Sequence, residues 1–205
     1  MWRNSLGQYL LLLAALFGFD AAFAGNGSVY RFIENKGQWD SAVQYKVQIP
    51  GGDLYVLKDG LKYVFYEFGA KGHHELGNEA HLRTADSKRN ERLLQAVELK
   101  FDNCKSSPAI YGSGEQSGVI NYFKGDKSSW AHGVRAFSSI TIEQIYDGID
   151  FKLYSSNGML KYDFIVAPEA DPGVIKLTYE GQSDLAIKDG RIVFNTVHGQ
   201  ITENR

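Results

Sequence analysis

The sequence predicts an all-β fold, either an antiparallel β-sandwich or two small stacked β-lobes built from hairpin meanders. Apolar and polar residues alternate over most of the chain after residue 29, which is the pattern of strands with one buried face. Asx-Gly dipeptides, which favour the tight turns of hairpins, recur between these stretches. The 22 Gly, 12 Tyr and 12 Phe against only 4 Pro agree with a chain of strands and turns.

The alternation of apolar and polar residues, together with the Asx-Gly dipeptides, predicts where the hairpins lie. Three are predicted, at residues 53–67 around Asp59-Gly60, at 149–167 around Asn157-Gly158 and at 184–197 around Asp189-Gly190.

Two other segments interrupt the strand pattern. Residues 69–92 are rich in charged residues and histidine, so we expect a solvated excursion with a short helix near residues 90–96. A lobe boundary is expected near residues 125–130.

Residues 1–24 have the features of a secretory signal peptide. Arg3 provides a positive start, residues 9–19 (YLLLLAALFGF) form a short apolar run, and Ala22-Phe23-Ala24 resembles a cleavage site. Eleven apolar residues are too few to cross about 30 Å of hydrocarbon. The sequence therefore predicts export by the Sec route to the cell surface or medium, and no membrane span in a mature chain beginning at residue 25.

The net charge argues against a nucleic-acid-binding protein, and the cysteine content argues against a disulfide-stabilised one. A formal net charge of -2 and a pI near 6.2 give no field that would hold a polyanion, so nucleic-acid binding is not expected. Cys104 is the single cysteine, so no intramolecular disulfide can form. No histidine lies near it in sequence to activate the thiol, and we interpret it as a structural residue.

The densest set of possible metal ligands is His73, His74 and His81. A zinc-protease helix needs a second histidine four residues after the first, and Asn78 occupies that position. We therefore treat the three histidines as weak metal candidates in a solvated loop, and expect no metal or other cofactor.

No catalytic residue can be assigned from the sequence. Asp126, Asp147, Asp150 and Asp163 are available for a paired-carboxylate hydrolase, but with 24 acidic residues their presence alone decides nothing. No serine nucleophile elbow or phosphate-binding glycine loop is present. A non-catalytic role is favoured, and a glycoside or ester hydrolase is the third hypothesis.

Aromatic residues near turns suggest a binding role. Tyr122, Trp130 and Tyr154 lie in or beside predicted turns, where flat rings could stack on sugar faces. The competing interpretation is that they pack in the core, as most aromatic residues in sheets do. A carbohydrate-binding module is therefore the second hypothesis.

Four phrases, in order along the chain, carry a family resemblance. Residues 32–39 (FIENKGQW), 121–125 (NYFKG), 146–150 (YDGID) and 160–168 (LKYDFIVAP) resemble an uncharacterised domain at the N-terminus of large exported Bacteroidota proteins. The resemblance covers nearly the whole mature chain and brings no known catalytic residues.

The resemblance implies a context. Related proteins continue into propeller-type repeats, immunoglobulin-like domains and a gliding-motility-type sorting domain for type IX secretion. It thus implies a structural or adhesive lead module whose partners are downstream domains, polysaccharide or cell-surface components. Because the sequence stops at Arg205 within an expected hairpin, we expect residues 25–205 to be a C-terminally truncated domain, periplasmic if the sorting domain is absent.

Overall fold

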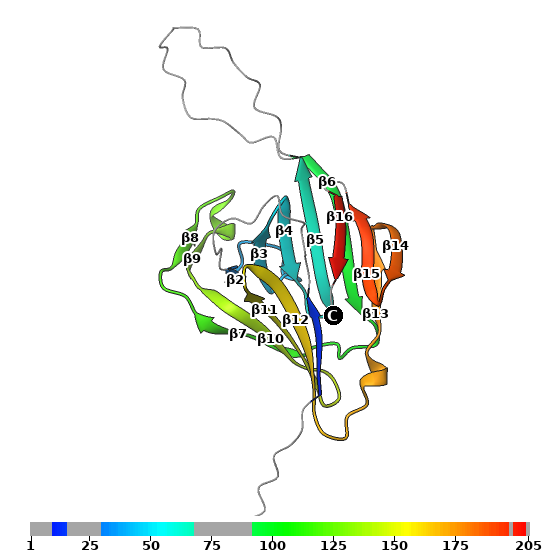
Figure 1. Ribbon diagram of the computed structural model, residues 1–205. Coiled ribbons are helices and arrows are strands. Elements are labelled where there is room, and N and C mark those ends of the chain that lie inside the picture. The colour runs from blue at the N-terminus through cyan, green and yellow to red at the C-terminus, as the bar shows by residue number, and fades with distance from the viewer. Residues whose placement is uncertain (1–9, 16–29, 68–91, 197–198, 204–205) are drawn as a thin grey trace, which may run out of the picture.

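The computed structural model describes residues 10–15, 30–67, 92–196 and 199–203 (Figure 1). These residues form strands joined by turns and two short 3-10 helices, and they contain no α-helix. The predicted all-β class is confirmed. No helix in this part of the chain is long and apolar enough to cross a membrane.

The largest element is a curled, 11-stranded antiparallel sheet. Its strand order is β1-β12-β11-β10-β2-β3-β4-β5-β6-β13, with β7 paired to β10 beside β2. The strands are β1 (Leu10–Ala15), β2 (Phe32–Glu34), β3 (Tyr45–Ile49), β4 (Gly52–Val56), β5 (Gly60–Glu67), β6 (Arg92–Phe101), β7 (Ala109–Glu115), β10 (Ala136–Tyr146), β11 (Ile149–Ser156), β12 (Met159–Val166) and β13 (Leu177–Glu180).

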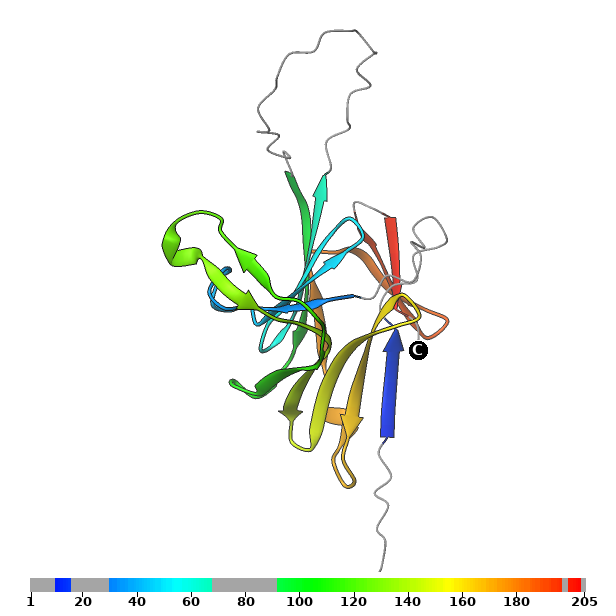
Figure 2. The same ribbon diagram turned by 90° about the vertical axis from the view of Figure 1, so that its left-hand side faces the viewer.

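Two smaller sheets complete the fold. One contains β14 (Ser183–Lys188), β15 (Arg191–Thr196) and β16 (Gly199–Glu203). The other contains β8 (Ile120–Tyr122) and β9 (Ala131–Val134), joined through the 3-10 helix η1 (Lys127–Ser129); a second 3-10 helix, η2 (Pro172–Val174), precedes β13. Figures 1 and 2 show the β8–β9 pair projecting from the curled sheet, on the side away from β14–β16.

The core lies on the concave face of the curled sheet. Alternation buries Phe101, Phe151 and Phe164, whose rings pack with centroids of Phe101 and Phe151 4.8 Å apart. Phe194 and Ile201 bring the three-stranded sheet into the same core. The layers are therefore one curled sheet and a small sheet packed against it. Residues 125–130 lie in the link of the β8–β9 pair, and strands from both sides of this link share the large sheet.

All three predicted hairpins are present. The Asn157-Gly158 and Asp189-Gly190 dipeptides have positive φ at both residues, as a type I′ turn requires. The first hairpin differs, because its turn is centred one residue earlier: the N–H of Leu57 donates to the carbonyl of Gly60 at 2.9 Å, and Gly60 already begins β5. The hairpin was predicted correctly, but Gly60 does not have the conformation expected of it.

The prediction of a short helix near residues 90–96 is wrong. β6 begins at Arg92 and pairs along its length with β5, so backbone hydrogen bonding to a neighbouring strand determines this segment. Most of the predicted excursion, including His73, His74 and His81, lies outside the described residues.

Part of the predicted signal peptide forms a strand. Leu10–Ala15 is β1, which pairs antiparallel with β12 in the register Leu10↔Val166 to Ala15↔Lys161. Residues 10–15 of the predicted signal peptide therefore occupy one edge of the large sheet.

Candidate functional site

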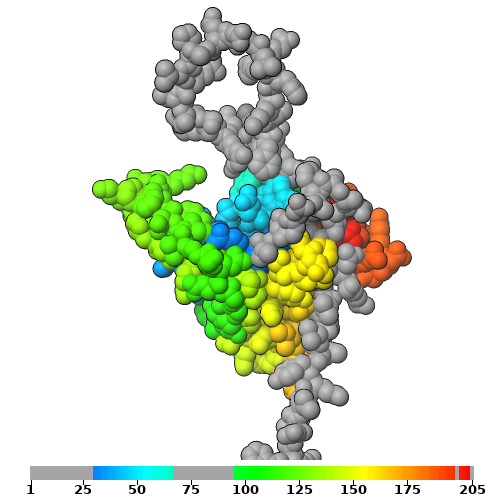
Figure 3. Space-filling model, turned by 60° about the vertical axis from the view of Figure 1, so that its left-hand side comes forward, coloured from blue at the N-terminus to red at the C-terminus, as the bar shows by residue number. Residues whose placement is uncertain are grey.

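The projecting β8–β9 pair, which we call the arm (residues 120–134), is held in shape by its link. Ile120 pairs with Val134 and Tyr122 with Ala131, with an irregularity between them. The N–H of Trp130 donates to the carbonyl of Lys127 at 3.2 Å, closing the 3-10 turn. The arm stands out from the body of the molecule in Figure 3.

Two aromatic rings are exposed on the arm. Phe123 is 58% exposed and Trp130 is 38% exposed, and their rings meet edge to face with centroids 5.3 Å apart. The ring of His132 lies 5.0 Å from that of Phe123, and the Nζ of Lys127 lies 6.0 Å from that of Trp130. An exposed aromatic pair with polar neighbours is typical of an interaction surface.

The indole of Trp130 is fixed by a hydrogen bond within the arm. Its Nε1–H donates to the carbonyl of Gly125 at 3.3 Å, and Gly125 adopts φ +76° to present that carbonyl. A ring already held in place loses less side-chain entropy when it binds a ligand.

Aromatic and charged contacts connect the arm to the large sheet. Tyr122 meets Trp39 edge to face at 5.5 Å, and the Nζ of Lys46 lies 5.7 Å from the Trp39 ring and 5.6 Å from the Tyr55 ring. The same ammonium forms an ion pair with Asp53 at 2.7 Å. Tyr122 therefore lies at the base of the arm, next to the ring of Trp39.

An ion pair holds the end of the arm. Arg135 follows β9, and its Nη2 donates to Oε2 of Glu34 at 2.8 Å while its backbone N–H donates to Oε1 at 2.9 Å. Burial alone would raise the pKa of the Glu34 carboxyl, but the hydrogen bonds and charge of Arg135 hold that pKa below its ordinary value. The arm therefore leaves the sheet from a fixed point.

The structure brings only part of the predicted sugar site together. Tyr122 and Trp130 lie on the same arm, but Tyr154 lies on β11, where the Nζ of Lys152 is 5.7 Å from its ring. Phe123 and His132 complete the exposed cluster. The sequence signal for Phe123 was its place beside Tyr122, whereas nothing in the spacing distinguished His132.

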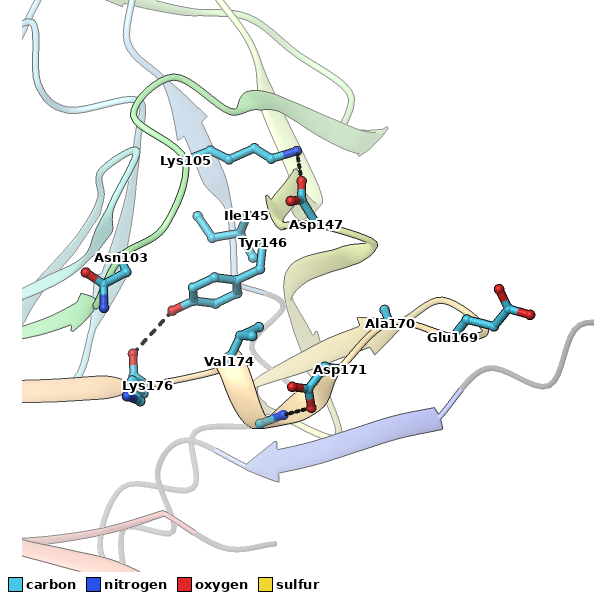
Figure 4. Close-up of a pocket in the computed structure, with 11 residues that line it drawn as sticks. Asn103, Lys105, Ile145, Tyr146, Asp147, Glu169, Ala170, Asp171, Val174 and Lys176 are labelled. Carbon is cyan, nitrogen blue, oxygen red and sulfur yellow. Dashed lines mark hydrogen bonds and ion pairs between the residues drawn. The ribbon is translucent and has the colours of Figure 1, made fainter.

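An open groove lies elsewhere, between the loop after β6 and the η2 segment (Figure 4). It has a volume of about 630 Å³ and is lined by Asn103, Lys105, Ile145, Tyr146, Asp147, Glu169, Ala170, Asp171, Gly173, Val174 and Lys176. Lys105 pairs with Asp147 at 2.8 Å, and Asp171 accepts the N–H of Gly173 at 2.8 Å. The hydrogen bond and charge of Lys105 lower the pKa of Asp147, the opposite of what a general acid needs.

Asp150, another of the carboxylate candidates, has a structural partner. Asp150 accepts the backbone N–H of Gln144 at 2.7 Å. Burial, with the nearby charge of Asp59, raises the pKa of the half-buried Cys104 thiol, which disfavours the nucleophilic thiolate. Within the described residues, no group of three or more His, Cys, Asp or Glu side chains could hold a metal ion.

Comparison with known proteins gives one result. Residues 32–205 match a family described as Domain of unknown function (DUF7948). No curated protein matches the chain, and no solved structure matches it.

Proposed function

We propose that this chain, which belongs to the DUF7948 family, is a non-catalytic adhesive module of an exported protein and binds carbohydrate through its arm. The observation that carries the proposal is the exposed pair Phe123 and Trp130 on a projecting, well-anchored element. The signal-peptide pattern of residues 1–24 supports export.

The chemistry of the arm suits a sugar. The apolar C–H face of a pyranose stacks on an aromatic ring, and its hydroxyls need hydrogen-bond partners close by. Trp130 and Phe123 supply the rings, and His132 and Lys127 lie beside them to supply polar groups. Because the exposed cluster contains only two large rings, we expect it to bind a repeating polysaccharide, which presents the same sugar face at many positions along one chain.

The test is polysaccharide binding by the exported product. Mixed-linkage β-glucan, xylan, galactomannan and an α-glucan are compared by affinity electrophoresis and titration calorimetry. Trp130→Ala is expected to weaken binding to the polysaccharide that the parent retains by at least about tenfold, equivalent to about 1.4 kcal/mol. Phe123→Ala is expected to act in the same direction, because the edge-to-face contact is lost.

Tyr154→Ala is the matched control, since it removes a ring outside the arm and should leave binding unchanged. Circular dichroism confirms that each variant is folded. The proposal is wrong if the parent binds none of the four, or if Trp130→Ala stays folded and binds as the parent does.

A further inference from the structure

Two exposed lysines accompany the exposed rings of the arm. The Nζ of Lys127 lies 6.0 Å from the ring of Trp130, and Lys124 directly follows Phe123 in the chain. Among the described residues, neither ammonium has a partner in an ion pair or a hydrogen bond. Each ring of the cluster therefore has an uncompensated lysine next to it, one in space and the other in the chain.

The formal charge of the arm has the opposite sign to that of the whole chain. Residues 120–134 contain two lysines and one acidic residue, Asp126, so their formal charge is +1 with His132 neutral, whereas the chain carries -2. Arg135 does not add to this charge, because it is paired with Glu34. At about 0.1 M salt, exposed charges act over only about 10 Å. A ligand on the arm therefore meets the positive charge of the arm more strongly than the negative charge of the body.

The hydrogen-bonding capacity of these groups indicates which ligand they suit. A lysine ammonium has three donors and no acceptor. The indole N–H of Trp130 already donates to the carbonyl of Gly125, so this donor is used within the arm. A sugar hydroxyl both donates and accepts, whereas a carboxylate or sulfate group only accepts and carries a negative charge. Because hydrogen bonds between charged groups are roughly twice as strong as neutral ones, an anionic group on the sugar makes the better partner for the lysines.

We propose that the arm binds acidic polysaccharides, whose sugars carry carboxylate or sulfate groups, in preference to neutral ones built from the same sugar. The inference rests on the proposed function, because stacking on Trp130 and Phe123 holds the sugar and the lysines add selectivity. Neutral polysaccharide is still bound through the rings, with lower affinity.

The test compares polysaccharides that differ only in charge. Polygalacturonate is paired with its full methyl ester, and dextran sulfate with dextran, in titration calorimetry at about 0.05 M salt. At least one acidic member is expected to bind at least tenfold more tightly than its neutral counterpart, and to lose this advantage at about 0.5 M salt. Poly-L-glutamate, which has the charge but no sugar face, is expected not to bind.

Variants of the arm assign the preference to particular side chains. The double variant Lys124→Gln/Lys127→Gln is expected to remove the preference for the acidic member while changing the affinity for the neutral one less than about twofold. Asp126→Asn removes the acidic residue of the arm and is expected to increase the preference. Lys188→Gln is the matched control, because Lys188 is an exposed lysine on β14, on the side of the molecule away from the arm (Figure 1).

The outcomes separate this inference from the proposed function. Equal affinity for both members of each pair would overturn the inference and leave sugar binding by the arm intact. Failure to bind any polysaccharide, acidic or neutral, would remove the proposed function as well. Binding of poly-L-glutamate as tight as that of polygalacturonate would also overturn the inference, as would a folded Trp130→Ala variant that binds the acidic member as the parent does. Either result would mean that charge alone is recognised.

Discussion

Replacing Gly60 with alanine is expected to lower the free energy of unfolding by about 3 kcal/mol, as overpacking of a well-packed site does. Gly60 is buried at the start of β5 and lies opposite Lys100 of β6. A Cβ at this position would lie 2.2 Å from the backbone carbonyl oxygen of Leu99. Since the obstacle is backbone and not a flexible side chain, two central strands would have to separate. Urea unfolding followed by circular dichroism measures the loss.

Gly158→Ala separates this steric effect from backbone strain. Gly158 has φ +73°, and a Cβ there would meet nothing within 4 Å. The only penalty is the left-handed conformation, which costs an L-residue about 1–2 kcal/mol. If Gly158→Ala proved the more destabilising of the two, the close approach of β5 and β6 would not be what requires glycine at position 60.

Gly60 also shows what local sequence patterns can and cannot predict. The alternation and the turn dipeptides predicted the hairpins, because a hairpin depends on residues that are near one another in the chain. The dipeptide Asp59-Gly60 looked like a turn centre, but the reason for glycine is a carbonyl on β6, beyond residues 69–91. The curl of the sheet and the pairing of β2 with β10 are likewise contacts between distant segments, which spacing in the sequence cannot reveal.

The same distinction between local contacts and contacts of distant segments applies to the candidate site. Tyr122 and Trp130 belong to one local arm, so an aromatic-rich turn was enough to indicate them. Trp39, which contacts Tyr122, comes from a distant loop, and no spacing connects the two. Tyr154 looked equivalent in sequence, but its strand lies within the large sheet and away from the arm.

Glu203 is a residue whose role only the structure reveals. In sequence it belongs to a polar C-terminal segment, yet it is only 4% exposed. Tyr179 donates to its Oε1 at 2.5 Å and Tyr162 donates to its Oε2 at 3.0 Å, so the carboxyl connects β16 with β13 and β12. Tyr63 lies close enough for its pKa to be raised by the Glu203 charge, after the larger effect of its own burial. Burial raises the pKa of Glu203, although the two hydrogen bonds act in the opposite direction.

The raised pKa predicts that the protein is more stable at pH 5 than at pH 8. Between the unfolded and folded pKa values of a carboxyl raised by folding, the folded state binds more protons than the unfolded state, so stability falls as pH rises through this interval. The loss is about 1.4 kcal/mol for each unit by which the pKa is raised. Urea unfolding at a series of pH values measures it. Below this interval the folded chain keeps the full benefit of a neutral, hydrogen-bonded Glu203.

Glu203→Gln is the variant that isolates the effect. It keeps the size of the side chain and an acceptor for one tyrosine, but it cannot ionise, so its stability should change less between pH 5 and pH 8 than that of the parent. Burial also raises the pKa of Asp163, which adds a dependence of the same sign, but this contribution is common to both proteins and cancels in the difference. Parallel stability curves for parent and variant would mean that Glu203 is already charged at pH 5. In that case the two tyrosine hydrogen bonds outweigh the cost of burying the carboxylate.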